Sequence, residues 1–148
     1  MPDSIKYEEN PIFDELTEGD DAPFNKFRLL IFAACVGFAH ERFIESPGRD
    51  LETRWMFIQQ DNRLRSILMA LTYADQGEPE VILDEELQVE ILRGYAAGGA
   101  RILEERVLDQ VGSNLDNLIS LIQENHDEEE LTEQVGILEE IEQDISGL

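Results

Sequence analysis

Hydrophobic residues in this chain recur mostly at helical spacing, which predicts a mainly α-helical protein. The clearest stripe lies in residues 24–42, where large apolar side chains return every three or four positions. Asp20 and Asp21, followed by Pro23, are typical of a helix start. We therefore expect a central, mostly buried helix over Phe24–Arg42.

Other segments with the same spacing follow residues that favour a helix N-terminus. Pro11 suits the first position of a short amphipathic helix, and Asp61, Asp84 and Ser113 are good N-caps. Gly77 and Gly112 favour helix ends after two of these segments. The helices expected here cover Pro11–Leu16, Asn62–Ala74, residues 85–110 and Asn114–Glu124.

Leu51–Ile58 fits a short strand and a helical turn equally well, because it follows a Ser-Pro-Gly turn and contains Trp55 among other large residues. The expected fold is therefore a single-domain bundle of five or six helices, with one short β segment near Trp55 as an open alternative. Residues 1–123 form this helical domain, and residues 124–148 form an acidic amphipathic C-terminal helix. That last helix either docks on a partner or closes the protein's own core.

Net charge changes the picture, because 34 acidic residues stand against 11 basic ones and the net charge is −23. Self-repulsion of this size weakens a compact state at ordinary ionic strength. Molar salt shortens the Debye length to about 3 Å and removes most of that penalty. A large acidic excess with only two lysines is typical of a cytoplasmic protein from a salt-accumulating organism, so we expect a halophilic host.

The charge is also unevenly distributed along the chain. Residues 21–75 hold seven acidic and seven basic residues, whereas residues 124–148 hold ten acidic residues and no lysine or arginine. The acidic ends allow an alternative interpretation, in which the protein is a DNA mimic or regulator whose negative faces bind a basic protein partner.

A cytoplasmic location is expected on other grounds as well. The single cysteine, Cys35, excludes an internal disulfide and suits a reducing compartment. The N-terminus lacks the basic and apolar regions of a signal peptide. The longest apolar run, Leu29–Ala39, is about half of what spans a bilayer.

No catalytic, cofactor-binding or metal-binding motif is present in the sequence. It contains no P-loop, no dinucleotide-binding glycine loop, no GxSxG, no CxxC and no HExxH. We therefore expect no catalytic residue, no cofactor and no metal. A small hydrolase is disfavoured, because no nucleophile stands in a pattern with a base.

Two groups of residues are candidates for binding. Arginines with neighbouring aromatic residues contact phosphates or a protein partner, while pairing with the many acidic residues is the alternative. The glycines after Tyr95 favour a close-packing interface, because each weakens a helix by about 1 kcal/mol unless a backbone packs there. The candidates are Arg42, Arg49, Arg54, Arg63 and Arg65 for phosphate or partner contact, and Tyr95, Gly98 and Gly99 for close packing.

Several short patterns in order resemble the Dnd system-associated protein 4 family, over about residues 11–110. The patterns are Lys26, Phe32-Ala33-Ala34, Gly37-Phe38, Ile67–Leu71, Ile82-Leu83 with Asp84, and Tyr95-Ala96 with Gly98-Gly99. Arg93-Gly94 departs from the acidic residues expected there.

The resemblance implies association with a DNA phosphorothioation modification and restriction defence system, and it transfers no catalytic residue. We therefore expect a non-enzymatic accessory protein that binds proteins of that system, or DNA within the assembled complex. Membrane association is not expected, and the oligomeric state is left open.

Overall fold

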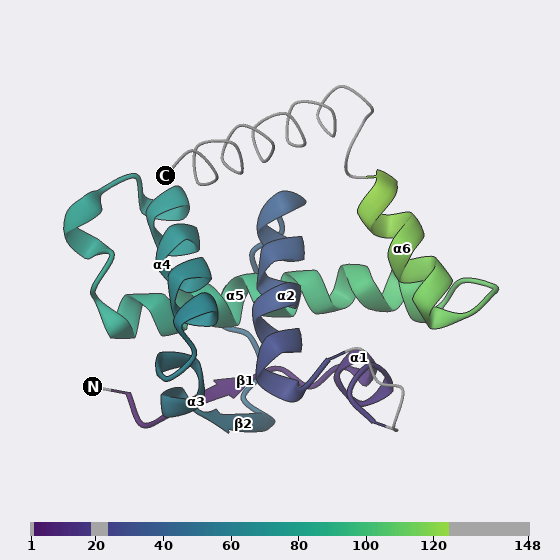
Figure 1. Ribbon diagram of the computed structural model, residues 1–148, viewed down its shortest axis with the longest axis horizontal. Coiled ribbons are helices and arrows are strands. Elements are labelled where there is room, and N and C mark those ends of the chain that lie inside the picture. The colour runs from purple at the N-terminus through teal and green to yellow at the C-terminus, as the bar shows by residue number, and fades with distance from the viewer. Residues whose placement is uncertain (1, 19–23, 125–148) are drawn as a thin grey trace, which may run out of the picture.

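Six α-helices and one two-stranded antiparallel sheet make up the described part of the chain, residues 2–18 and 24–124 of a computed structural model (Figure 1). The predicted mainly α fold with a short β segment near Trp55 is confirmed. In chain order the elements are β1 (Ser4–Tyr7), α1 (Pro11–Glu15), α2 (Lys26–Ala39), β2 (Leu51–Arg54), α3 (Trp55–Gln59), α4 (Asn62–Gln76), the 3₁₀ turn η1 (Pro79–Val81), α5 (Glu85–Leu103), the π-helical turn η2 (Glu104–Leu108) and α6 (Asn114–Glu124).

The core is organised around the crossing of two helices. Figure 1 shows α5 running through the middle of the molecule with α2 lying across it. Leu30 and Ala34 of α2 and Leu92 and Ala96 of α5 are fully buried. Helix α4 packs against both helices, β1 packs on α5, and α6 packs against η2. Burial of these apolar surfaces is the main favourable term in folding.

Helix boundaries follow local capping. The Asp61 carboxylate accepts hydrogen bonds from the backbone N–H of Arg63 and Leu64 at 3.0 and 3.2 Å, and the Asp84 carboxylate accepts from Leu87 at 3.2 Å. These bonds satisfy N–H groups that the first helical turn leaves without a partner. The Ser113 hydroxyl likewise accepts from the Asp116 N–H at 3.1 Å, so all three predicted caps are confirmed.

The central helix is shorter than predicted at both ends. It begins at Lys26 because Asn25 is its N-cap, with the side-chain oxygen accepting from the Arg28 N–H at 2.9 Å. The helix ends at Ala39 rather than Arg42. Asp20, Asp21 and Pro23, which favoured an earlier start, lie outside the described residues.

Both alternatives for residues 51–58 occur in succession, because β2 passes directly into α3. Strand β2 pairs antiparallel with β1, and Ile5 lies opposite Thr53. The sequence analysis did not predict β1. Its alternating pattern places Ile5 and Tyr7 in the core, and four residues are the shortest alternation that indicates a strand. The predicted C-terminal helix over 124–148 falls almost wholly outside the described residues.

Candidate functional site

Glycines on both α5 and α2 allow the two helix backbones to approach closely. A Cβ on Gly99 would overlap the carbonyl group of Ala33, and a Cβ on Gly37 would overlap the carbonyl group of Tyr95. The obstructing atoms belong to backbone rather than to the end of a flexible side chain. Only glycine therefore fits at Gly37 and Gly99 while the two helices keep this spacing.

A second close approach is made by the segment that leaves α2. Gly94 lies against the ring of Phe43, and Gly98 lies against the carbonyl group of Arg42. The backbone N–H of Ile44 donates to the Gly94 carbonyl at 3.1 Å. The residues predicted to form a close-packing interface thus face other parts of the same chain: Gly98 and Gly99 through their backbone, and Tyr95 through its carbonyl and its ring.

The turn that ends α2 holds Glu41 in the left-handed conformation, with φ of 54°. The Glu41 N–H donates to the Phe38 carbonyl at 3.1 Å, and the Arg42 N–H donates to the Gly37 carbonyl at 2.8 Å. These two bonds form a Schellman motif, in which glycine is the usual residue at the left-handed position. A residue with a side chain costs about 1 kcal/mol there.

An open cavity of about 520 Å³ lies where the ends of α2 and α4 meet α5. Its aromatic walls pack edge to face around Tyr95. The Tyr95 ring centroid lies 5.5 Å from that of Phe38 and 4.9 Å from that of Phe43, with interplanar angles of 76° and 72°. The lining residues are Phe38, Ala39, Glu41, Phe43, Ala74, Asp75 and Tyr95.

The electrostatic character of this cavity is negative, because its described lining holds two carboxylates and neither lysine nor arginine. The Tyr95 hydroxyl donates a hydrogen bond to the Asp75 carboxylate. Burial, that hydrogen bond, and the nearby charges of Asp75 and Glu41 raise the pKa of Tyr95 to about 12. The phenol is therefore a neutral hydrogen-bond donor at physiological pH.

The five predicted arginines are exposed and come from separate parts of the chain. Only Arg42 forms an ion pair with another described residue, at 3.7 Å from the Glu105 carboxylate. Arg65 donates to the Asn62 side chain at 3.4 Å. Arg42 follows α2, Arg49 precedes β2, Arg54 ends β2, and Arg63 and Arg65 lie in the first turn of α4.

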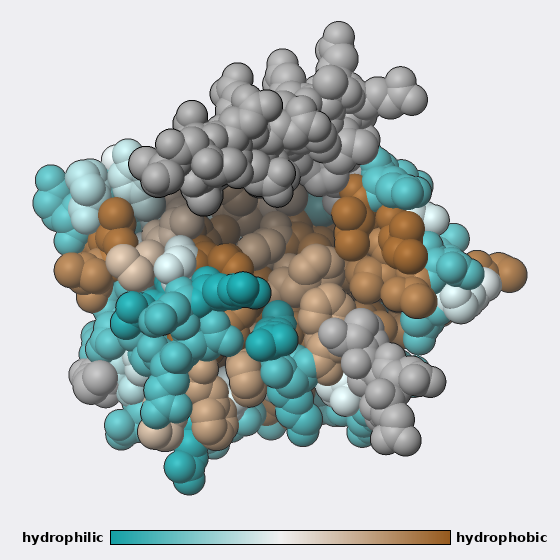
Figure 2. All heavy atoms as spheres, viewed as in Figure 1, coloured by the Kyte–Doolittle hydropathy of each residue, from teal (hydrophilic) through white to brown (hydrophobic). Residues whose placement is uncertain are grey.

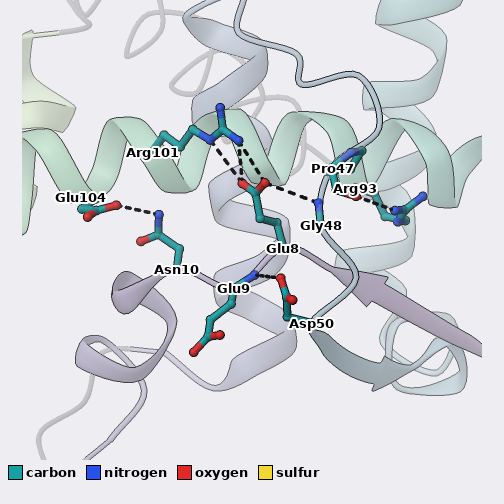
Figure 3. A network of polar contacts seen from close by, with 9 residues as sticks. All are labelled: Glu8, Glu9, Asn10, Pro47, Gly48, Asp50, Arg93, Arg101 and Glu104. Atoms are coloured by element: carbon teal, nitrogen blue, oxygen red, sulfur yellow. Dashed lines mark hydrogen bonds and ion pairs between the residues drawn. The ribbon is translucent and has the colours of Figure 1, made fainter.

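Arginines outside the predicted set make the densest polar contacts (Figure 3). Arg93 is only 3% exposed. Its guanidinium donates to the carbonyl groups of Lys6 and Pro47 at 2.5 and 3.3 Å and to the Glu90 carboxylate at 3.1 Å. Arg93 thereby ties β1 and the loop before β2 to the middle of α5.

A second arginine holds the end of the N-terminal segment. The Arg101 guanidinium donates to both carboxylate oxygens of Glu8 at 3.0–3.2 Å, and Glu8 also accepts from the Gly48 N–H at 3.4 Å. One turn beyond, the Asn10 amide donates to the Glu104 carboxylate at 2.8 Å. Because these groups are already partnered, the network is structural rather than a binding site (Figure 3).

Helix α6 exposes a row of aliphatic side chains, and Figure 2 shows hydrophobic residues gathered over this helix. Leu115, Ile119 and Ile122 are 58%, 44% and 44% exposed. Spacings of four and three residues place them on one face of the helix. Leu118 and Leu121 are buried directly beside this row, where α6 packs against η2. We refer to Leu115, Ile119 and Ile122 as the α6 row.

Sequence reasoning did not identify Glu41, Phe43 and Asp75 as neighbours of Tyr95. They come from the end of α2, the segment after it, and the end of α4, and they meet only in the folded chain. No local spacing indicates this meeting. Within residues 2–18 and 24–124 there is no group of three or more potential metal ligands, and no helix is long and apolar enough to cross a bilayer.

The fold and its contacts define a small, mainly α-helical protein built on a glycine-lined helix crossing. The chain belongs to the family of DNA sulphur modification system-associated protein 4, whose model matches residues 5–140. The family resemblance read from the sequence is thereby confirmed, and the match extends beyond the expected 11–110 at both ends. Comparison with curated proteins and with solved structures gives no match.

Proposed function

We propose that this protein is a non-enzymatic accessory protein of a DNA sulphur modification system, and that it acts by binding another protein of that system. Membership of the family supports the assignment of this protein to such a system. The observation that carries the binding role is the α6 row. Aligned aliphatic side chains on an exposed helix face suit docking against a second protein.

Charge favours a protein over DNA as the partner. A net charge of −23 repels a phosphate backbone, and affinity for duplex DNA depends on neutralising phosphates with lysine and arginine. The five predicted arginines are divided among the segment between α2 and β2, the end of β2 and the start of α4, rather than gathered on one helix face. The same acidic excess supports a cytoplasm rich in salt as the setting, where self-repulsion is screened.

The test is a tagged pull-down of the full chain from the native host in molar KCl, with and without nuclease. The α6 row is changed by the double substitution Leu115→Ser and Ile119→Ser. The matched control is Ser120→Ala with Gln123→Ala, which alters exposed positions of the same helix. We expect the wild type and the control to recover modification or restriction subunits after nuclease treatment, and the row variant to lose them.

Other outcomes would contradict the proposal. Recovery that requires intact DNA would assign the contact to DNA, and loss of that recovery in Arg54→Glu with Arg63→Glu would locate it on the arginines. Recovery of no subunit of the system under either condition would remove the accessory role. A row variant that binds as well as the wild type would remove α6 as the docking face.

A further inference from the structure

The cavity around Tyr95 combines two kinds of group that together suit a cation. Phe38, Phe43 and Tyr95 provide aromatic rings, and Glu41 and Asp75 provide carboxylates. A cation over an aromatic face is attracted by the ring quadrupole, and this attraction grows as water is excluded. The volume of the cavity, about 520 Å³, lies within the range of small-ligand pockets.

Asp75 is held in position by hydrogen bonds from other side chains. It accepts from the Tyr95 hydroxyl on one oxygen and from the Gln76 amide at 2.6 Å on the other. Each carboxylate oxygen has two lone-pair sites, so Asp75 can accept a further donor at either oxygen. The carboxylate is therefore preorganised without being saturated.

Glu41 provides a separate argument for function. Its φ of 54° places it at the Schellman position that glycine normally fills, so the chain holds a carboxylate at a position where a side chain is disfavoured. Strained residues of this kind concentrate at binding sites, where the surrounding structure holds them in place. Glu41 lines the aromatic cavity, and its negative charge lies near enough to Tyr95 to help raise the pKa of that phenol.

We propose that this cavity binds an arginine side chain presented by a protein partner. A guanidinium suits it better than an ammonium, because the planar group stacks on aromatic rings while its N–H groups bond a carboxylate in pairs. The C-terminal residues 125–148 contain no arginine, so that segment cannot supply the guanidinium. This inference rests on the proposed function in one respect, namely that a partner protein supplies the arginine.

The test measures binding of N-acetyl-arginine methylamide to the full chain, by following the ring resonances of Tyr95 and Phe43 by NMR. The neutral isostere N-acetyl-citrulline methylamide is the matched control ligand at the same ionic strength. We expect saturable shifts with the arginine probe and at least tenfold weaker binding of the citrulline probe. Equal binding of the two probes, or no binding of either, would overturn the proposal.

Glu41→Gly is the decisive variant, because it removes the carboxylate and relieves the left-handed strain together. It should melt no lower than the wild type and bind the arginine probe at least tenfold more weakly. Wild-type affinity in this variant would overturn the role of Glu41. A melting temperature no lower than that of the wild type shows that the weaker binding is not caused by unfolding of the variant.

Two further arms identify the source of the cation. Tighter binding of free arginine than of the capped probe would indicate an amino-acid ligand, and self-association that Glu41→Gly abolishes would indicate a second copy of this chain. Either result would overturn the proposal that a partner protein supplies the cation. The probe needs no other protein, so its failure is distinguishable from failure of the pull-down through the α6 row.

Discussion

Gly99 of α5 lies against the carbonyl group of Ala33 in α2, in the space that a side chain would occupy. The two central helices therefore cross with backbone on backbone. One turn further along α2, Gly37 lies against the Tyr95 carbonyl group, so the same crossing places the end of α2 beside the aromatic cavity.

Substitution of Gly99 by alanine should be strongly destabilising. The added Cβ meets backbone atoms of Ala33 and Gly37, which cannot move without separating the helices, and overpacking of this kind costs about 3 kcal/mol. Urea denaturation in molar KCl measures the loss. Ser120→Ala is the control, since alanine in an exposed helix is neutral or favourable. Equal stability of Gly99→Ala and the wild type would contradict the close crossing.

Arg93→Met should destabilise the protein although it replaces a charge by an apolar group of similar length. It leaves the carbonyl groups of Lys6 and Pro47 without their donor, and each buried unsatisfied acceptor costs about 1–3 kcal/mol. Arg63→Met, at an exposed position, should change the free energy of unfolding by about 0.5 kcal/mol or less. Comparable denaturation midpoints for the two variants would exclude the structural role of Arg93.

Tyr95 should titrate about two pH units above an ordinary tyrosine. Its pKa of about 12 compares with the usual 10.0. Between these values the folded protein holds a proton that the unfolded chain has lost, so the contribution to stability is full below pH 10 and falls as pH rises towards 12. Absorbance at the phenolate band, taken as the difference between wild type and Tyr95→Phe, measures the pKa.

Asp75→Asn is the matched control for that titration. It removes the negative charge near the phenol while keeping a hydrogen-bond acceptor of the same size, so the pKa of Tyr95 should move down towards 10. An unchanged titration in Asp75→Asn would mean that Asp75 does not act on the phenol as the structure indicates.

Helicity should depend on salt. With a net charge of −23, self-repulsion opposes the folded state at low ionic strength, and molar KCl screens charges more than about 3 Å apart. The circular dichroism signal at 222 nm should therefore deepen between 10 mM and 2 M KCl. Sucrose as an uncharged co-solute controls for general exclusion effects, and a signal that is flat across KCl would remove the salt-adaptation hypothesis.

The sequence was a good guide to helices whose boundaries depend on neighbouring residues. Asp61 and Asp84 cap the helices that follow them because an N-cap acts within three residues. The start of α2 was wrong because two acids and a proline resembled an N-terminus more strongly than Asn25 did. Local patterns therefore located the elements better than their ends.

Contacts between residues that are distant in the sequence could not be predicted from local patterns. Strand β1 is held by residues far along the chain: β2 pairs with it, with Tyr7 opposite Leu51, and Arg93 of α5 donates to the Lys6 carbonyl. The carboxylates of Glu41 and Asp75 meet at Tyr95 only after three helices have packed. Gly98 and Gly99 could be recognised in the sequence as close-packing residues, but their neighbours in α2 and in the segment after it are brought to them only by the folded chain.

The pairing of Glu8 with Arg101 has a consequence for synthesis of the chain. The two residues are 93 positions apart, and ribosomes add about 5–20 residues per second. Roughly 5–20 seconds therefore pass before the N-terminal segment meets the helix that anchors it. During that interval Ile5 and Tyr7 lack their final cover, and the charge that keeps this end of the nascent chain apart from its neighbours is that of residues 1–20, with seven acidic residues and one lysine.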